Sequence, residues 1–369
     1  MKKKILHVSA GGLGHGGVSA VIFSIVESLH TQFDFGCVVY ARERERDSYF
    51  TEFGRIHRIS CYPTKGKRNY FELITRPHKL YWGIRKICRE QKYDVIHCHN
   101  QRDEWICLLA AKHAGVPVRI AHAHNPNSTK KKSFIEKVYK SLSPKMMEKT
   151  ATINLGCSKA ACEEFYCHDR FTVVPNAIDL EKYSLPTSRE NNAMNFIHVG
   201  RYTYQKNQDF VLETFAEICK ISPEARLYLV GFGEASEVER LKALIHELGI
   251  SDQVEMVPGD VADIPSYYAR SRYMIFPSRF EGFGIVLIEA QAMGIECYAS
   301  EAIPTEADVG LLHFMDLSDG PRAWAERIVA DIKNGTGLSL DTEKLSQYSN
   351  ESISKRYAAI YNGEPESVQ

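Results

Sequence analysis

The chain has 369 residues, 44% of them hydrophobic and 25% charged, which is typical of a globular protein and argues against a disordered or fibrous chain. No apolar run approaches the roughly 20 residues of a membrane-spanning helix. The N-terminal apolar run is also too short for a signal peptide, so we expect a cytoplasmic protein whose ten cysteines are reduced. The net charge of zero hides an asymmetry: residues 1–180 carry 29 Lys and Arg against 17 Asp and Glu, and residues 181–369 carry 17 against 29.

Short apolar strands alternate with helical segments through the first half of the chain. The predicted strands are Ile5–Ser9, Phe35–Tyr40, Asp94–His97, Val118–Ala121, Ala151–Leu155 and Thr172–Val174, and the predicted helices include Val18–His30, Leu80–Arg89 and Glu104–Ala114. Such alternation predicts a parallel sheet covered by helices and joined by right-handed crossovers. We therefore expect residues 1–180 to form a Rossmann-like domain.

A polar segment without periodicity, residues 181–195, is predicted to be a linker, after which the alternation restarts. The strands expected there are Phe196–Val199, Arg226–Val230, Val254–Val257, Tyr273–Phe276 and Cys297–Ala299. Residues 196–344 are thus expected to form a second Rossmann-like domain, with a last helix at about 345–369 packed back on the first. The predicted fold class is α/β, with two facing doubly wound domains that bind ligand at the carboxyl ends of their strands.

A glycine-rich loop, residues 11–17, follows the first predicted strand and opens a helix. Glycines there let an anion approach the free N–H groups at a helix N-terminus, although a simple tight turn is the alternative. An NAD-dependent oxidoreductase would need an acidic residue about 20 positions further on. That region reads Tyr40-Ala41-Arg42, which argues against this class.

The segment Gly200–Asn207 occupies the equivalent place in the second half, between its first strand and first helix. Arg201 and Lys206 lie five residues apart in this loop, where both can converge on a diphosphate. A charge-assisted hydrogen bond from each would contribute on the order of 1.5–3 kcal/mol. The alternative is a pair of solvated surface charges.

The most specific motif spans residues 277–290, from a strand end through a glycine turn into a helix. Glu281 is expected in the loop, and Glu289 about one turn into an otherwise apolar helix. Burying that carboxylate is costly unless it accepts hydrogen bonds, which vicinal hydroxyls can donate. The amides of Phe283, Gly284 and Ile285 are placed to meet phosphate oxygens at the helix start.

These motifs resemble those of the retaining glycosyltransferases of family four, which have the GT-B architecture. The resemblance rests on E-G-x-G-x-x-x-x-E-A from Glu281, on G-R-x-x-x-x-K-N at Gly200–Asn207, on V-P-N-x-x-D at Val174–Asp179 and on L-V-G-x-G at Leu229–Gly233. It is nearest to enzymes of bacterial capsular polysaccharide and exopolysaccharide biosynthesis. Two positions depart from the family pattern: Glu296 stands where proline is common, and Ala177 replaces a glycine.

The resemblance implies a role for each matching residue. Glu289 should accept hydrogen bonds from the donor's ribose, Glu281 should bind the donor sugar, and Arg201 with Lys206 should neutralise the diphosphate. Gly16 and Gly17 should lie beside the phosphate and the acceptor. A histidine near the reacting sugar should be His124, with His122 and His99 as weaker candidates.

The implied reaction moves a hexose or N-acetylhexosamine, with retention, from a nucleotide-diphosphate sugar to a lipid-linked or glycan acceptor. UDP is the expected carrier, and no cofactor is expected. Two other interpretations remain open: a nucleotide-sugar epimerase of related fold, and a catalytically inactive glycosyltransferase that acts as a partner of an active one.

Two histidine pairs, His97 with His99 and His122 with His124, end two predicted strands with a spacing that metal sites use. Neither pair has an evident third or fourth ligand, as zinc would require. The sequence also lacks an Asp-x-Asp motif, which argues against a metal-bound diphosphate. We therefore predict no metal site.

Two basic stretches, residues 64–92 and 129–149, combine lysines and arginines with aromatic or aliphatic residues. Basic residues near anionic lipid contribute roughly 1 kcal/mol each. We expect them to dock the first domain on the inner face of the cell membrane, the alternative being ordinary helices with solvated lysines. No nucleic-acid partner is expected.

Overall fold

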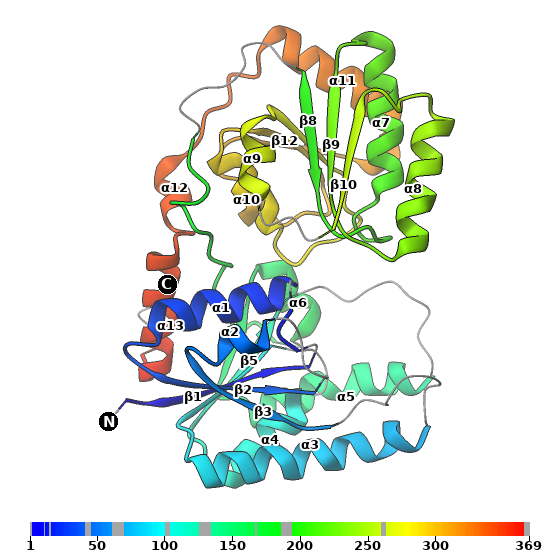
Figure 1. Ribbon diagram of the computed structural model, residues 1–369. Helices are drawn as coiled ribbons and strands as arrows, with labels where there is room; N and C mark the ends of the chain where they lie inside the picture. The colour runs from blue at the N-terminus through cyan, green and yellow to red at the C-terminus, as the bar shows by residue number, and fades with distance from the viewer. Residues whose placement is uncertain are drawn as a thin grey trace. The chain divides into compact units, whose positions relative to one another are not determined.

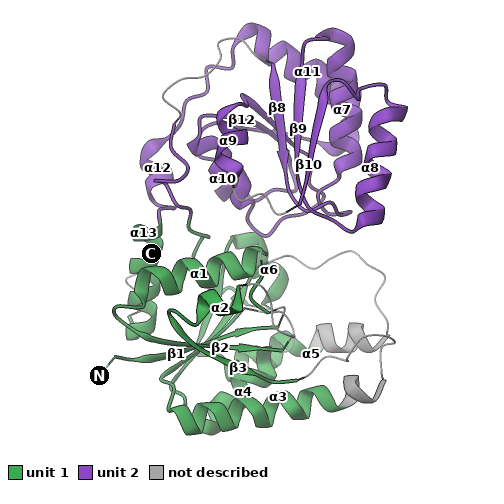
Figure 2. Cartoon of the chain, viewed as in Figure 1, with its two compact units in different colours: residues 1–177, 350–369 green, residues 178–349 purple. Residues whose placement is uncertain are grey.

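The computed structural model describes residues 2–10, 12–14, 16–40, 46–60, 70–99, 104–124, 134–166, 168–185, 194–259 and 263–364, without the side chains of 70–74 and 134–141. These residues form two compact units (Figures 1 and 2). Unit 1 comprises residues 1–177 and 350–369, and unit 2 comprises residues 178–349. Each contains a parallel sheet with helices around it, which confirms the predicted α/β fold of two Rossmann-like domains.

Unit 1 is built on a parallel sheet with strand order β3-β2-β1-β4-β5-β6-β7. Its strands are β1 (Lys4–Ser9), β2 (Asp34–Val39), β3 (Gly54–Arg58), β4 (Val95–Cys98), β5 (Val118–Ala123), β6 (Ile153–Gly156) and β7 (Thr172–Val173). Its helices are α1 (Gly17–Leu29), α2 (Asp47–Phe50), α3 (Tyr70–Gln91), α4 (Glu104–Ala114), α5 (Phe134–Thr150), α6 (Lys159–Phe165) and α13 (Asn350–Asn362).

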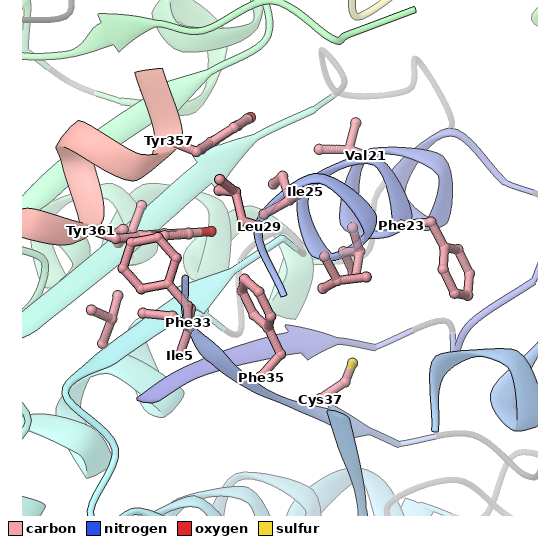
Figure 3. Close-up of a cluster of buried hydrophobic side chains, with 14 of the residues drawn as sticks. Ile5, Val21, Phe23, Ile25, Leu29, Phe33, Phe35, Cys37, Tyr357 and Tyr361 are labelled. Carbon is pink, nitrogen blue, oxygen red and sulfur yellow. The ribbon is translucent and has the colours of Figure 1, made fainter. Parts of the chain in front are cut away.

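The last helix, α13, completes the core of unit 1 although it comes from the far end of the chain. Tyr357 and Tyr361 are buried together with Ile25 and Leu29 of α1 and with residues of the central strands (Figure 3). Two hydrogen bonds join α13 to the rest of unit 1, from Ser24 Oγ to Asn350 Oδ1 at 2.9 Å and from the Arg356 guanidinium to the Val173 carbonyl at 2.8 Å. The C-terminal helix therefore packs on the N-terminal unit.

Unit 2 repeats the architecture with strand order β10-β9-β8-β11-β12-β13, again parallel. Its strands are β8 (Asn195–Val199), β9 (Arg226–Gly231), β10 (Val254–Pro258), β11 (Tyr273–Phe276), β12 (Glu296–Ser300) and β13 (Leu312–Met315). Its α-helices are α7 (Gln208–Ile221), α8 (Ala235–Glu247), α9 (Ile264–Ala269), α10 (Ile285–Ala292), α11 (Gly320–Asn334) and α12 (Thr342–Ser346). Trp324 of α11 is fully buried in its core.

The sequence pattern misses β3 and β13, and both lie at sheet edges. Each is only partly buried, so neither carries the continuous apolar run that marks a central parallel strand. The chain divides at 177/178 rather than at 180/181. Ile178 forms a parallel bridge with Ser349, so the two points at which the chain passes between the units are hydrogen-bonded neighbours.

Candidate active site

Two loops of unit 2, Gly200–Asn207 and Pro277–Gly284, follow β8 and β11 respectively. These strands are neighbours in the sheet and run parallel, so their carboxyl ends lie at one edge. The loops thereby bring Lys206 of one predicted motif against Glu281 of the other. The two motifs that the sequence analysis assigned to donor binding therefore lie in contact in unit 2.

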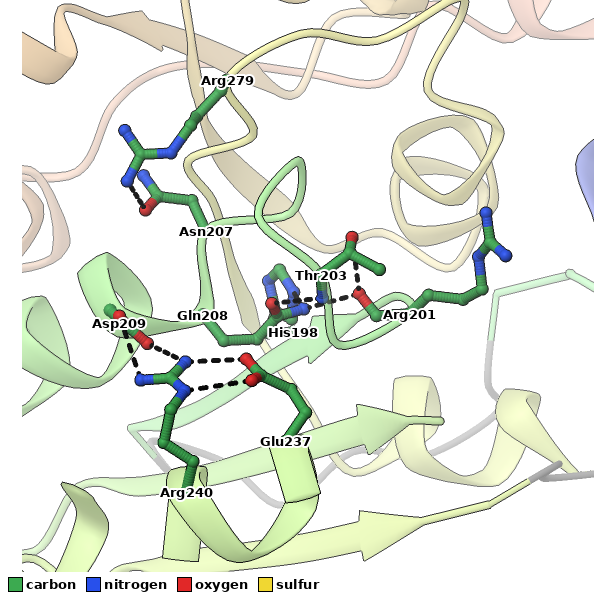
Figure 4. Close-up of polar contacts among 9 residues, drawn as sticks. All are labelled: His198, Arg201, Thr203, Asn207, Gln208, Asp209, Glu237, Arg240 and Arg279. Atoms are coloured by element: carbon green, nitrogen blue, oxygen red, sulfur yellow. Dashed lines mark hydrogen bonds and ion pairs between the residues drawn. The ribbon is translucent and has the colours of Figure 1, made fainter. Parts of the chain in front are cut away.

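Four hydrogen bonds join the two loops. The Arg279 amide donates to the Gln205 carbonyl at 2.8 Å, and Gln205 Nε2 donates to the Phe280 carbonyl at 2.9 Å. Asn207 Nδ2 donates to the Pro277 carbonyl at 3.1 Å, and the Arg279 guanidinium donates to Asn207 Oδ1 at 2.7 Å (Figure 4). This bonding fixes the loops relative to each other before any ligand binds, which is the preorganisation that a binding site needs.

The loop after β8 also depends on two special backbone positions. Asn207 caps α7 in the left-handed conformation, with φ 57° and ψ 47°, a region that asparagine tolerates better than most residues. At Gly231 a Cβ would lie 1.9 Å from the Gly200 carbonyl oxygen, so the strand beside the loop has no space for a side chain there.

Lys206 and Glu281 form an ion pair, with Nζ 2.8 Å from Oε1. Only 16% of the lysine side chain and 8% of the glutamate side chain are exposed. The Lys206 ammonium also lies 4.5 Å from the centroid of the Phe276 ring, a cation–π distance. A buried ion pair contributes little net stability, because desolvation offsets the attraction, so its value lies in holding two charged groups at a fixed place.

Arg201 is exposed, and no described residue accepts a hydrogen bond from its guanidinium, which extends away from the Arg279–Asn207 contact in Figure 4. Its carbonyl is held instead: Gln208 Nε2 donates to it at 2.9 Å. The backbone of this predicted phosphate ligand is thus held by a hydrogen bond, and its guanidinium is available to bind a ligand.

His198 and Gln208 hold this loop in place through hydrogen bonds, and the sequence analysis missed both. His198 Nδ1 donates to the Ile275 carbonyl at 2.9 Å, and its Nε2 lies 3.3 Å from Gln208 Nε2. Burial lowers the pKa of His198 to about 4, so the ring is neutral and its Nε2 can accept. The sequence feature that could have indicated His198 is its place within an otherwise apolar strand.

The start of α10 is the segment predicted to meet phosphate oxygens. Gly284 is its N-cap with φ 90° and ψ 46°, a left-handed conformation suited to glycine. No described residue accepts a hydrogen bond from the amides of Phe283, Gly284 or Ile285. The Phe283 ring is buried 5.7 Å from that of Tyr348, which fixes the turn.

Glu289 is partly buried on α10 and accepts hydrogen bonds from two tyrosines, Tyr268 at 3.3 Å and Tyr183. Burial raises the pKa of its carboxyl to about 7, and the two tyrosine hydroxyls and the Lys182 and Lys206 charges oppose that rise. From the sequence we expected Glu289 to need a hydrogen-bond donor, and we assigned that role to the ribose hydroxyls alone. The tyrosines are partners within the protein, and Tyr183 comes from the segment predicted to be a linker.

In unit 1, Gly16 is the N-cap of α1 and Gly17 its first residue. A Cβ built at Gly14, Gly16 or Gly17 would meet no atom within 4 Å. Packing within the described protein therefore does not require glycine at these three positions, in contrast to Gly231.

The histidines at the strand ends lie close together in unit 1. His99 Nδ1 and His124 Nε2 are 3.0 Å apart, and His97 Nε2 and His122 Nδ1 are 3.1 Å apart. A fifth, His7 of β1, places its Nδ1 2.8 Å from His99 Nε2. Burial lowers the pKa of every one of these rings, to about 3 for His7 and His124. The sequence treated the two pairs separately and missed His7.

The basic stretches fall on α3 and α5. Residues 64–69 and 129–133 lie outside the described part of the chain. Trp82 of α3 and Leu142 of α5 are large apolar side chains with about half of their surface exposed. Among the described residues, no helix combines the length and the apolar character needed to cross a bilayer.

Comparison with known proteins agrees with this architecture. Residues 15–182 match the family described as Glycosyltransferase Family 4, and residues 186–309 match the family described as Glycosyl transferases group 1. The fold and these two matches define the chain as a glycosyltransferase with the GT-B fold. The first half of the chain thus resembles the glycosyltransferases of family four.

Its relatives include EpsF of Bacillus subtilis, named as a glycosyltransferase, which is 26% identical over 89% of this chain and 87% of its own. The UDP-Gal:alpha-D-GlcNAc-diphosphoundecaprenol alpha-1,3-galactosyltransferase of Escherichia coli is 29% identical over 62% of each chain. Among solved structures, Anabaena Alr3699/HepE in complex with UDP and glucose superposes with a TM-score of 0.78 at 16% identity, over 98% of this chain and 100% of that one.

Proposed function

We propose that this glycosyltransferase transfers a hexose or N-acetylhexosamine from a UDP-sugar, with retention, to a lipid-linked or glycan acceptor in cell-surface polysaccharide biosynthesis. Two relatives support the substrates: the E. coli enzyme uses UDP-Gal and a diphosphoundecaprenol acceptor, and the Anabaena structure holds UDP and glucose. The observation that carries the proposal is the joined pair of loops in unit 2, which collects Arg201, Lys206, Glu281 and the start of α10 at one place.

The donor would bind along this structure. Glu289, on α10, would accept hydrogen bonds from the two ribose hydroxyls, for which an ionised carboxylate has free lone pairs. The amides of Phe283, Gly284 and Ile285 and the cations Arg201 and Lys206 would contact the diphosphate. Glu281, already beside Lys206, would bind hydroxyls of the sugar.

The chemical demand of the reaction is the negative charge that develops on the departing diphosphate. Arg201 and Lys206 supply two positive charges in a preorganised loop, so we infer that the transfer is metal-independent. The Lys206–Glu281 pair keeps the ammonium oriented in the free enzyme. Retention without a carboxylate nucleophile implies attack from the side of the leaving group, with a phosphate oxygen accepting the acceptor's proton.

Unit 1 would bind the acceptor. The space around Gly14, Gly16 and Gly17 supports this role, because glycine there leaves room that the protein itself does not fill. His124, at the end of β5, is the candidate for contact with the reacting sugar. The exposed Trp82 and Leu142 on α3 and α5 support peripheral attachment of this cytoplasmic enzyme to an anionic membrane.

A thermal-shift screen of UDP-, GDP- and ADP-sugars tests the donor proposal, since a ligand that binds the folded state raises its apparent stability. We expect UDP-sugars to stabilise the protein and the others not to. Product analysis with a polyprenyl-diphosphate sugar acceptor then tests transfer, and the anomeric configuration of the product tests retention. Stabilisation by GDP- or ADP-sugars alone would refute the UDP assignment.

A further inference from the structure

Unit 1 contains a cluster of five histidines, of which the proposed transfer reaction uses only His124. The cluster contains His7, His97, His99, His122 and His124, of which all but His124 are at most 1% exposed. Among the described residues, most hydrogen-bonding contacts of these rings are to one another, and the one other side-chain partner is Tyr361, whose hydroxyl lies 2.8 Å from His97 Nδ1. None of these contacts joins one of the five rings to a carboxylate or a carbonyl, although four of the rings are buried.

Two ring nitrogens in the cluster, His7 Nε2 and His122 Nε2, are buried and have no hydrogen-bond partner in the described structure. Leaving a buried polar atom unpaired costs about 1–3 kcal/mol. An unprotonated imidazole nitrogen is the form that binds metal ions. The unpaired His122 Nε2, which lies among other imidazole rings, is therefore a potential metal ligand.

The geometry points to a transition-metal site formed by His99, His122 and His124, for a borderline divalent ion such as Zn²⁺. One ring nitrogen from each residue lies within 4.8 Å of the other two. Zinc binds imidazole nitrogens at about 2.0–2.1 Å, so ligands of one tetrahedral ion stand about 3.4 Å apart. Small ring rotations would reach that spacing, and a water molecule would complete the coordination.

The surrounding histidines act as supports for these ligands. His97 Nε2 lies 3.1 Å from His122 Nδ1, and His7 Nδ1 lies 2.8 Å from His99 Nε2. His99 and His122 therefore each have one ring nitrogen beside a neighbouring histidine, and metal-bound histidines commonly have their second ring nitrogen hydrogen-bonded in this way. If His122 Nδ1 donates to His97, its Nε2 lone pair is left free for the ion.

A second triad, His7, His97 and His99, also has its nitrogens within reach of one another. All three of its rings are fully buried, whereas His124 is partly exposed and offers an entry path for an ion. We therefore assign the ion to the triad that contains His124. An ion there would compete with the acceptor for the His124 ring, which is why the test below does not use transferase activity.

The test is a titration of the tag-free full chain, freed of metal by chelation, with Zn²⁺ in competition with a chromophoric chelator. We expect one tight site in the wild type, and a loss of affinity of ~100-fold or more in both His122→Gln and His124→Gln. His57→Gln is the matched control, because His57 is half-buried in unit 1 and bonded to Tyr93, outside the cluster. Circular dichroism checks the fold of each variant.

Replacement of Zn²⁺ by Co²⁺ gives a readout that needs no variant. We expect the visible absorption of a tetrahedral nitrogen-ligated ion in the wild type, at one equivalent. Equal affinity in wild type, His122→Gln and His124→Gln would overturn the proposal, as would an octahedral cobalt spectrum. Loss of binding in His7→Gln and His97→Gln with retention in His124→Gln would overturn the assignment to this triad.

Discussion

Lys206 and Glu281 come from different loops and meet in a largely buried ion pair of 2.8 Å in unit 2. Each is also a proposed donor ligand, so the contact links stability to catalysis. Removing one partner of such a pair leaves the other charge unpaired. A bound diphosphate would offer Lys206 a second anionic partner, and Glu281 would then be free to share its lone pairs with sugar hydroxyls.

Lys206→Met should therefore lower both activity and stability. We expect transfer to fall by 100-fold or more, on the order of 3 kcal/mol of lost charge stabilisation, and unfolding to need about 1–3 kcal/mol less free energy because Glu281 is left unpaired. Chemical denaturation and initial rates measure the two effects.

The double variant Lys206→Met/Glu281→Gln separates them. It removes both charges, so stability should recover towards the wild type while transfer stays lost. Recovery of transfer together with stability would mean that Lys206 serves the fold and not the diphosphate.

Glu289 should make donor binding depend on pH. Burial raises its pKa to about 7, and the ionised carboxylate is the better acceptor for ribose hydroxyls. The affinity for UDP-glucose should therefore rise from about pH 6 to about pH 8, a range in which a sugar diphosphate keeps its charge. Calorimetric titration at several pH values measures this.

The stability of the free protein should change with pH in the opposite sense. The pKa of Glu289 is about 7 in the folded state, so the folded state holds this proton up to about pH 7, whereas the unfolded chain releases it near the ordinary value of 4.5. Between these values the folded state binds more protons, so its stability falls as pH rises. Glu289→Gln should remove both dependences, and Glu247→Gln, at an exposed position on α8, should remove neither.

Tyr183 should set the midpoint of that profile. Its hydroxyl donates to Glu289 and so favours the ionised form against the larger effect of burial. In Tyr183→Phe the pKa of Glu289 should rise further, and the increase in UDP-glucose affinity should move to higher pH. An unchanged midpoint with a uniformly weaker affinity would show that Tyr183 acts only through packing against Tyr268.

The sequence predicts most strands of the two sheets and the positions of the two loops of the candidate site, because both depend on local patterns. Central strands carry continuous apolar runs, and the motifs at Gly200 and Glu281 follow strands that any parallel sheet would place side by side. Edge strands lack that run, which is why β3 and β13 are missed.

The supporting residues could not be predicted in the same way. Tyr183 reaches Glu289 from a polar segment that has no periodicity, and His7 joins His99 only because β1 pairs with β4 in that register. These contacts depend on tertiary pairing between segments distant in the sequence. A residue's own neighbours in the chain carry no signal of them.

The glycines of the two units should respond differently to alanine. At Gly231 a Cβ would lie 1.9 Å from a backbone oxygen, and the φ of 156° is itself unfavourable for other residues. Gly231→Ala should therefore unfold or strongly destabilise unit 2. At Gly17 a Cβ would meet nothing within 4 Å, and alanine is favoured over glycine in a helix by about 1 kcal/mol.

Gly17→Ala should thus keep or slightly raise the melting temperature, and yet reduce transfer by 10-fold or more, since the methyl group would occupy space that we assign to the substrates. If Gly17→Ala transfers sugar at the wild-type rate, the open space at the start of α1 is not a substrate site, and the acceptor must be sought elsewhere on unit 1.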